Sequence, residues 1–347
     1  MKSLRFLPLL PKSVAVPLLA VLAACGGGGG DPAVPSHQAE AAPDAGVLQA
    51  AISDADRVKA ATATATSNSN ICYSIRPFYW EIGDVSAAKA GGSVKSSGST
   101  TSYGPNSVMP YTSASKWMYA AYVAEVRAGV LATNDVDMLS LRSGYTNFLA
   151  CTRRQTVDSC LAYRKNGVYD PATAGKFYYG GGHMQKHASM NGLGSANGPA
   201  LAAAIKSRIG TDIAITYSQP QPAGGASGTP DAYARFLRKL IGRQLKLGDL
   251  LGSHAVCAAP TVCPTEAIYS PMPPDESWSY SIGHWVESDP AVGDGSFSSA
   301  GVDGFYPWID ASRSLYGIVA RSATNGVHES VHCGQLIRKA WFTGVAQ

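Results

Sequence analysis

The chain has 347 residues, and its 28 lysines and arginines against 24 acidic residues give a net charge of only +4. No basic cluster is interleaved with aromatic residues, so the sequence gives no case for a nucleic-acid partner. Six tryptophans, seventeen tyrosines and a hydrophobic share of 45% predict a chain that folds around a substantial core.

Residues 1–25 have the layout of an export signal. Basic residues precede an apolar run, which ends in small residues at Cys25. The run is too short and too often interrupted by proline for a transmembrane span, which needs about 20 apolar residues. Its ending, "LAAC", resembles the cleavage box of bacterial lipoproteins, which implies lipidation of Cys25 and a periplasm-facing place in the cell envelope. In such lipoproteins a residue other than Asp after the cysteine, here Gly26, implies the outer membrane. The alternative to a lipoprotein signal is an ordinary secretory signal that is cleaved near the same place.

Residues 26–70 are rich in Gly, Ala, Pro, Ser and Thr and nearly free of large apolar side chains. Such a segment cannot bury enough surface to offset the entropy lost on ordering. We therefore expect a flexible tether with a short helix over residues 47–59, followed by a folded domain over residues 71–347.

Six cysteines follow Cys25, and an even number in an exported chain predicts three disulfides. Six cysteines allow fifteen pairings. Closeness in sequence favours two short loops and leaves one long-range pair, giving Cys151–Cys160, Cys257–Cys263 and Cys72–Cys333. The sequence has no CxxC pair and no Cys/His quartet at zinc spacing, so we expect no metal and no cofactor.

The predicted elements place strands at both chain ends and helices between them. Residues 72–94 mix β-branched and aromatic residues with glycine, which is typical of a two-stranded hairpin. Short β-like runs return over residues 277–322. Start and stop signals predict helices over 113–128, 199–209, 229–241 and 326–341. If both ends share one sheet, the Cys72–Cys333 pairing follows without strain.

The stretch "TSASKW" places Ser113 and Lys116 one turn apart at the start of a predicted helix. The unpaired N–H groups of such a turn favour an anion nearby. A desolvated lysine has a lowered pKa and can take the proton of the serine. The tetrapeptide alone is equally compatible with a helix cap and a solvated lysine.

The wider stretch "TSASKWMYAAYVAEV" resembles the active-site serine segment of the serine β-lactamase and penicillin-binding-protein superfamily, especially its class C and esterase-like branch. Similar motifs follow in order, with "SG" at Ser143, "FYYGGG" where the family has Y-x-N, and "SAG" where it has K-T-G. The resemblance covers nearly all of residues 72–341.

This resemblance implies an α+β, β-lactamase-like fold. An antiparallel sheet flanked by helices would be built from residues 71–129 and 270–347, and residues 130–269 would form a mainly helical subdomain. The active site would lie in the cleft between the two parts.

The resemblance also implies roles for individual residues. Ser113 would attack a carbonyl group, while Lys116 and Tyr179 would share its proton as general base and acid. The oxyanion would lie between the backbone N–H groups of Ser113 and Val302. Tyr178 is the rival for the catalytic tyrosine.

Two positions depart from the family pattern. Gly181 stands in place of the asparagine, and Ser299 in place of the lysine of K-T-G. Both changes weaken recognition of a substrate carboxylate, which favours esters and neutral amides over β-lactams. Ala300 and Gly301 would line the substrate site beside Ser299 and Gly181.

His183 would either line the same pocket or pack in the interior. With His187 it has the i, i+4 spacing of a metal pair, but the glutamate and third ligand of a zinc protease are missing.

The sequence therefore predicts an exported serine hydrolase that acts on a small-molecule ester, amide or lactam and contacts the membrane only through its lipid. An esterase or amidase is the first choice. A β-lactamase or D-alanyl-D-alanine carboxypeptidase is the nearest alternative, and a non-catalytic binding module on the same fold is the second.

Overall fold

The computed structural model describes residues 52–347, so the export signal, Cys25 and most of the expected tether lie outside the described residues. The helices are α1 (Asp54–Ala65), α2 (Ser115–Val126), α3 (Thr133–Leu139), α4 (Val157–Leu161), α5 (Gly182–Ala188), α6 (Gly198–Ile209), α7 (Pro230–Ile241) and α8 (Val327–Thr343). Among residues 52–347, no helix is long and apolar enough to cross a membrane.

The strands fall into three sheets. An eight-stranded sheet has the order β2 (Ala88–Val94), β1 (Phe78–Asp84), β13 (Leu315–Ala320), β12 (Tyr306–Ile309), β11 (Phe297–Ser298), β10 (Trp285–Val286), β9 (Ser279–Tyr280) and β7 (Val256–Cys257). The smaller sheets are β3 (Met109–Pro110) with β6 (Ala226–Gly228) and β5 (Ile215–Tyr217), and β4 (Phe177–Tyr178) with β8 (Ala267–Tyr269).

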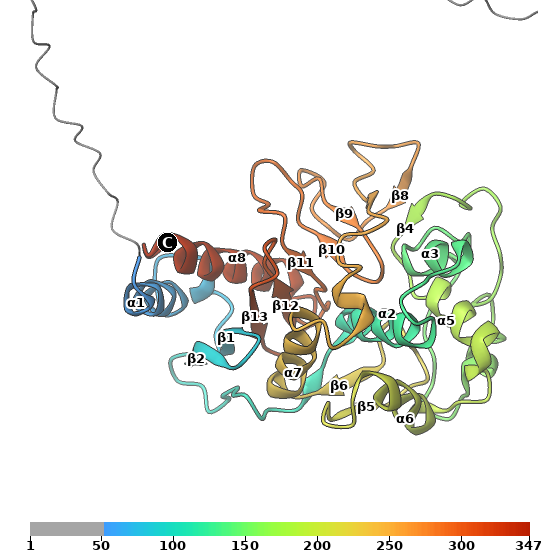
Figure 1. Cartoon of the computed structure of the whole chain (residues 1–347), viewed down its shortest axis with the longest axis horizontal. Coiled ribbons are helices and arrows are strands. Elements are labelled where there is room, and N and C mark those ends of the chain that lie inside the picture. The colour runs from blue at the N-terminus through green and yellow to red at the C-terminus, as the bar shows by residue number, and fades with distance from the viewer. Residues whose placement is uncertain (1–51) are drawn as a thin grey trace, which may run out of the picture. The chain divides into compact units, whose positions relative to one another are not determined.

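The large sheet joins the two ends of the folded chain, as the sequence predicts. Strand β1 pairs antiparallel with β13, from Tyr79 opposite Ala320 to Asp84 opposite Leu315. The predicted hairpin over residues 72–94 is present as β1 and β2. All seven strand pairs of this sheet are antiparallel, which confirms the expected α+β architecture (Figure 1).

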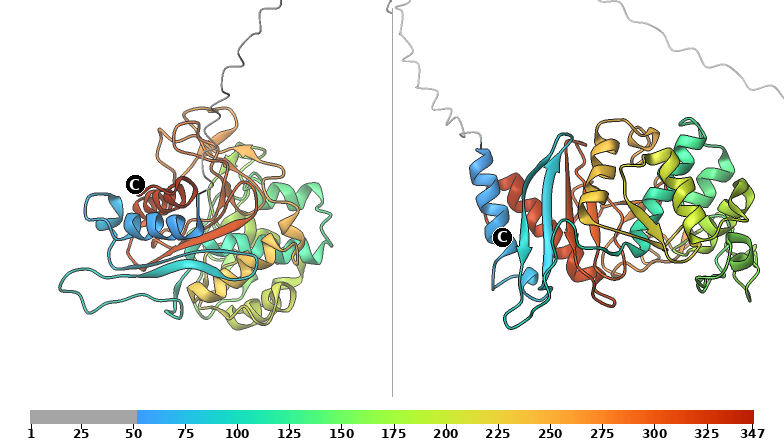
Figure 2. Two further views of the ribbon diagram at one scale, coloured as in Figure 1. Left: turned by 60° about the vertical axis from the view of Figure 1, so that its left-hand side comes forward. Right: turned by 90° about the horizontal axis from the view of Figure 1, so that it is seen from below.

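Helices cover both faces of the sheet. Helix α8 packs on β12 and β13, and α1 packs on α8, whereas α7 packs on the same strands from the other side (Figure 2). The remaining helices gather around α2, beyond α7 (Figure 1). Helix α2 is buried from Ser115 to Ala124, so it forms the centre of the molecule and carries the residues next to Ser113.

The end of the expected tether is ordered, which corrects the sequence-based expectation. Helix α1 covers residues 54–65, six residues beyond the expected end at residue 59, while residues 47–51 of the expected helix lie outside the described residues. The side chain of Ser53 accepts a hydrogen bond from the Asp56 N–H and caps the helix. Ala60, Ala61 and Ala65 are buried, because these small side chains allow α1 to lie closely against α8. A polar, alanine-rich segment thus finds enough surface to fold upon.

The expected boundaries of the helical part also change. Strand β7 and helix α7 both fall within residues 130–269. However, β7 is an edge strand of the large sheet, and α7 packs on strands β12 and β13 of that sheet. Helices α6 and α7 themselves agree with the predicted ranges, and each begins after a capping side chain, Asn197 and Thr229 respectively.

The three expected disulfides are present. Cys151 bonds to Cys160 of α4, and Cys257 of β7 bonds to Cys263, so each of these disulfides closes a short segment of the chain. The third joins Cys72 to Cys333 across 261 residues and ties the segment before β1 to α8.

Candidate active site

Ser113 lies in a single turn of 3-10 helix, Thr112–Ala114, immediately before α2. Thr112 has φ of 46°, a left-handed conformation that is unfavourable for a β-branched residue. The Ser115 hydroxyl fixes the turn, because it donates to the Thr112 carbonyl at 2.6 Å and accepts from the Ala226 N–H at 3.1 Å. Such strain is found where a functional side chain must be held in place. Ser113 remains partly exposed.

Lys116 is buried on the first turn of α2, with 4% of its surface exposed. Its Nζ lies 3.1 Å from the Ser113 Oγ and 3.0 Å from the Ala223 carbonyl oxygen. Burial lowers the pKa of this ammonium to about 7. A neutral lysine within hydrogen-bond distance of a serine hydroxyl can accept its proton.

Tyr179 lies on the other side of Lys116. The lysine Nζ is 4.6 Å from the centre of the Tyr179 ring, and that ring stacks on Trp285 at 5.1 Å between centroids. Burial raises the pKa of Tyr179 to about 12, and hydrogen bonds with Ser113 and Trp285 act against this rise. Tyr178 instead packs against Tyr269, at 5.3 Å between ring centroids. Of the two tyrosines that the sequence offers, the structure brings Tyr179 to Ser113.

Residues 299–302 lie in the turn between β11 and β12, against the nucleophile. The Ser299 hydroxyl is 3.4 Å from the Ser113 carbonyl oxygen. A Cβ on Gly301 would overlap the backbone of Tyr111 and the side chain of Thr112, so only glycine allows this approach. Ala300 is buried, whereas Val302 is exposed. Within residues 52–347 the Val302 N–H bonds to no acceptor, which leaves it available to a substrate oxygen.

His183 is packed in the interior, on α5, and both its ring nitrogens are hydrogen-bonded. Its Nδ1 is 3.3 Å from the Ser143 N–H and 2.8 Å from the Ser143 hydroxyl, and its Nε2 is 3.0 Å from the Tyr178 carbonyl. Because a backbone N–H must donate to Nδ1, the proton is on Nε2. Burial lowers the pKa of His183 to about 4, so the ring is neutral. The geometry therefore favours the alternative in which His183 packs in the interior and links Ser143 to Tyr178 of β4.

Gly181 is the residue just before α5, where its carbonyl accepts from Gln185. It brings no side chain toward Lys116, and a Cβ there would lie 2.9 Å from the Phe148 ring and 3.6 Å from the Ala223 Cβ. Sequence reasoning missed Ala223, because this residue contributes only a backbone carbonyl. It also missed Phe148, which lies in a loop without a regular pattern.

His187 is also buried on α5 but belongs to a separate network. Its Nε2 is 2.8 Å from the Asp135 carboxylate, and its Nδ1 is 2.7 Å from the Tyr119 hydroxyl. Since Tyr119 is on α2, this network joins the nucleophile helix to α3 and α5. The two histidines that have the spacing of a metal pair thus have different partners.

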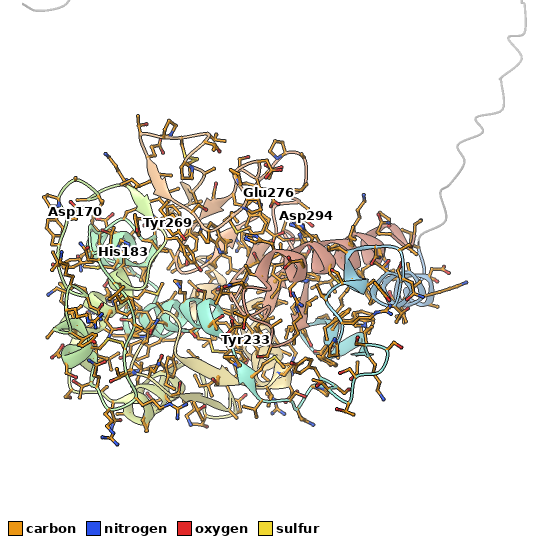
Figure 3. The ribbon with its side chains drawn as sticks, turned by 180° about the vertical axis from the view of Figure 1, so that it is seen from behind. Asp170, His183, Tyr233, Tyr269, Glu276 and Asp294 are labelled. Atoms are coloured by element: carbon orange, nitrogen blue, oxygen red, sulfur yellow. A yellow bond between two sulfur atoms is a disulfide. The ribbon has the colours of Figure 1, made fainter. Side chains whose placement is uncertain are left out.

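A groove of about 1000 Å³ lies away from Ser113, between α8, the loop after β10 and the turn after β12. Glu276 and Asp294, which line it, pair with His332 and Arg338 of α8. In Figure 3 both acidic residues lie to the right of Tyr269 and His183. Asp294 is paired with Arg338, and Asp310 is hydrogen-bonded within its own turn. These carboxylates stabilise local structure and do not belong to the candidate active site.

Comparison with solved structures shows which fold this is. The D-amino acid amidase of Ochrobactrum anthropi matches with a TM-score of 0.58 at 11% identity, over 82% of this chain and 99% of that one. The chain has the β-lactamase-like fold. A D-stereospecific amidohydrolase from Streptomyces matches with a TM-score of 0.55 at 12% identity, over 85% of this chain and 100% of that one. A β-lactamase from Mycobacterium bovis matches with a TM-score of 0.52 at 14% identity, over 77% and 94%.

These matches confirm the fold that the resemblance in sequence implied. No protein-family model matches the chain, and no curated protein matches it in sequence. The likeness is thus one of three-dimensional structure, and it shows the fold of this β-lactamase-like domain.

Proposed function

We propose that the chain is a serine hydrolase that forms an acyl-enzyme on Ser113. The observation that carries this proposal is the buried Lys116, whose pKa near 7 makes it a competent base 3.1 Å from the Ser113 Oγ. If Lys116 only formed part of a helix end, its ammonium group would stay in water, because burying an ammonium group costs free energy.

In acylation, Lys116 accepts the Ser113 proton while Oγ attacks the carbonyl carbon of the substrate. The oxyanion is stabilised by the backbone N–H groups of Ser113 and Val302. Tyr179, with its pKa near 12, is protonated at neutral pH and donates to the leaving group. In deacylation a water molecule takes the place of the leaving group, and the same groups act in reverse.

The substrate class follows from the two departures from the family pattern. Ser299 is neutral, and its hydroxyl contacts the Ser113 carbonyl, so it supplies no cation for a substrate carboxylate. Gly181 supplies no side-chain amide. We propose an esterase or amidase, and these features oppose a β-lactamase or carboxypeptidase, although such enzymes share the acylation step.

A fluorophosphonate probe tests the nucleophile. Intact mass and peptide mapping should show one adduct on Ser113 in the wild-type chain and none in Ser113→Ala. A folded wild-type chain without an adduct would contradict the proposal and favour a non-catalytic binding module. Hydrolysis of a chromogenic cephalosporin at a rate similar to that of simple esters would instead identify a β-lactamase.

We also propose that Cys25 carries a lipid that holds the domain at the periplasmic side of the envelope. Support comes from the "LAAC" box and from the disulfides, which are typical of oxidising compartments. Labelled palmitate should enter the wild-type chain but not Cys25→Ser. Equal absence of label from both chains would favour an ordinary secretory signal.

A further inference from the structure

Two of the three consecutive glycines at 180–182, Gly181 and Gly182, are explained by a loop that lies against them. A Cβ on Gly182 would overlap the carbonyl oxygen of Tyr145 and lie 3.2 Å from the Phe148 Cβ. A Cβ on Gly181 would lie 2.9 Å from two atoms of the Phe148 ring. The Phe148 ring thus fills the volume that a side chain at position 181 would need.

Phe148 is held in this place by its neighbours. The Leu149 N–H donates to the buried Asn166 side chain at 2.9 Å, and Asn166 donates to the Cys160 carbonyl at 2.9 Å. The Cys151–Cys160 disulfide closes the same loop. Phe148 itself remains partly exposed.

A short series of contacts connects Phe148 to the base. The Cβ position of Gly181 is 3.6 Å from the Ala223 Cβ, and the Ala223 carbonyl accepts from Lys116 at 3.0 Å. Lys116 thus contacts both Ser113 and Ala223, and the Gly181 position connects Ala223 to Phe148. The other neighbours of Ser113 are Tyr179 and the turn that carries Ser299.

These positions determine where each part of a substrate lies. The leaving group must be near Tyr179 to receive its proton, and the oxyanion must be near Val302. The acyl group is then left with the residues connected to Lys116 through Ala223, of which Ala223 is buried and Phe148 is partly exposed. An aromatic ring stabilises an apolar chain by burying its surface and gives a carboxylate no partner.

We propose that Phe148 is the specificity-determining wall of the acyl-group subsite and selects uncharged, apolar acyl groups. This inference rests on the proposed function, because it requires an acyl-enzyme on Ser113. It assigns to Phe148 a role in substrate choice and none in proton transfer.

The test compares p-nitrophenyl acetate, octanoate and hemisuccinate as substrates of the full chain, with one leaving group throughout. In the wild type we expect kcat/KM to be highest for octanoate and lowest for the carboxylated hemisuccinate. In Phe148→Ala the octanoate-to-acetate ratio of kcat/KM should fall about tenfold, because the octanoyl group loses its contact with the Phe148 ring. The ratio should stay within about threefold in Phe148→Leu, which keeps an apolar wall.

Leu149→Ala is the matched control, since Leu149 is the exposed neighbour on the same loop and should leave the ratio unchanged. If Phe148→Ala does not fold, Phe148→Gln, of similar length, should lower the ratio in its place. Each variant is labelled with fluorophosphonate. If Ser113 is labelled but the octanoate-to-acetate ratio of Phe148→Ala equals that of the wild type, the role proposed for Phe148 is wrong. A wild-type preference for hemisuccinate would also contradict that role. Neither result would contradict the acyl-enzyme on Ser113. A wild-type chain that neither labels nor hydrolyses any ester overturns the proposed function and this inference with it.

Discussion

The Lys116 Nζ lies between the Ser113 Oγ, at 3.1 Å, and the Ala223 carbonyl, at 3.0 Å. Burial lowers the pKa of Lys116 to about 7. Because the base is active when neutral, log kcat/KM for a neutral ester should rise with a slope of one below pH 7 and level off above it. A profile that is flat between pH 5 and 8 would exclude Lys116 as the base.

The same burial predicts a cost in stability. The unfolded chain keeps the ordinary lysine pKa of 10.5, so between pH 7 and 10.5 it binds more protons than the folded chain. The contribution of Lys116 to the free energy of unfolding should therefore rise with pH in this window. Lys116→Met should abolish activity. It should also raise the free energy of unfolding at pH 7 by roughly a few kcal/mol, because it removes a buried ammonium group.

Urea unfolding measures this change, with Lys186→Met as the control at a partly exposed lysine of α5. We expect the control to change the free energy of unfolding by about 0.5 kcal/mol or less. A lower unfolding midpoint for Lys116→Met would show that the ammonium is stabilised by the fold.

The two neighbouring tyrosines should differ in their effect on catalysis. Tyr179→Phe removes the proton donor and should lower kcat by about 10²- to 10⁴-fold. Tyr178→Phe should retain activity within a fewfold, because its ring packs against Tyr269. Steady-state kinetics on one ester decides between them, and the reverse order would assign the role to Tyr178.

The contact between Gly181 and Phe148 predicts a coupling of their substitutions. Gly181→Asn forces a side chain into the volume of the Phe148 ring and should destabilise the fold by about 1–3 kcal/mol. In a Phe148→Ala background the same change should cost clearly less. Thermal unfolding of the four chains gives the coupling energy, and strict additivity would show that the two residues do not compete for space.

The long-range disulfide should contribute more to stability than a local one. Replacing Cys72 and Cys333 by serine opens a loop of 261 residues and should cost about 2–5 kcal/mol. The matched pair is Cys257 and Cys263, separated by only six residues, whose loss should cost less. Equal denaturant midpoints for the two double variants would contradict this.

Local patterns in the sequence determined much of the architecture. Capping residues and glycines predicted α6 and α7, because caps and helix propensity act over short stretches. Strand-like runs at both ends were visible for the same reason, and the family resemblance implied that they share one sheet. The long-range disulfide was the pair that remained once the cysteines close in sequence were paired. The spacing of Ser113 and Lys116 was also visible, since one helical turn brings such residues together.

Only the tertiary structure decided the rest. It ordered residues 54–65 as α1, because the packing surface on α8 is supplied by the far end of the chain. It buried Lys116 and brought Tyr179 rather than Tyr178 to Ser113, since these distances depend on how separate segments pack. It also placed Phe148 against Gly181, a contact between two loops that no local pattern encodes, and this contact now accounts for the glycine at that position.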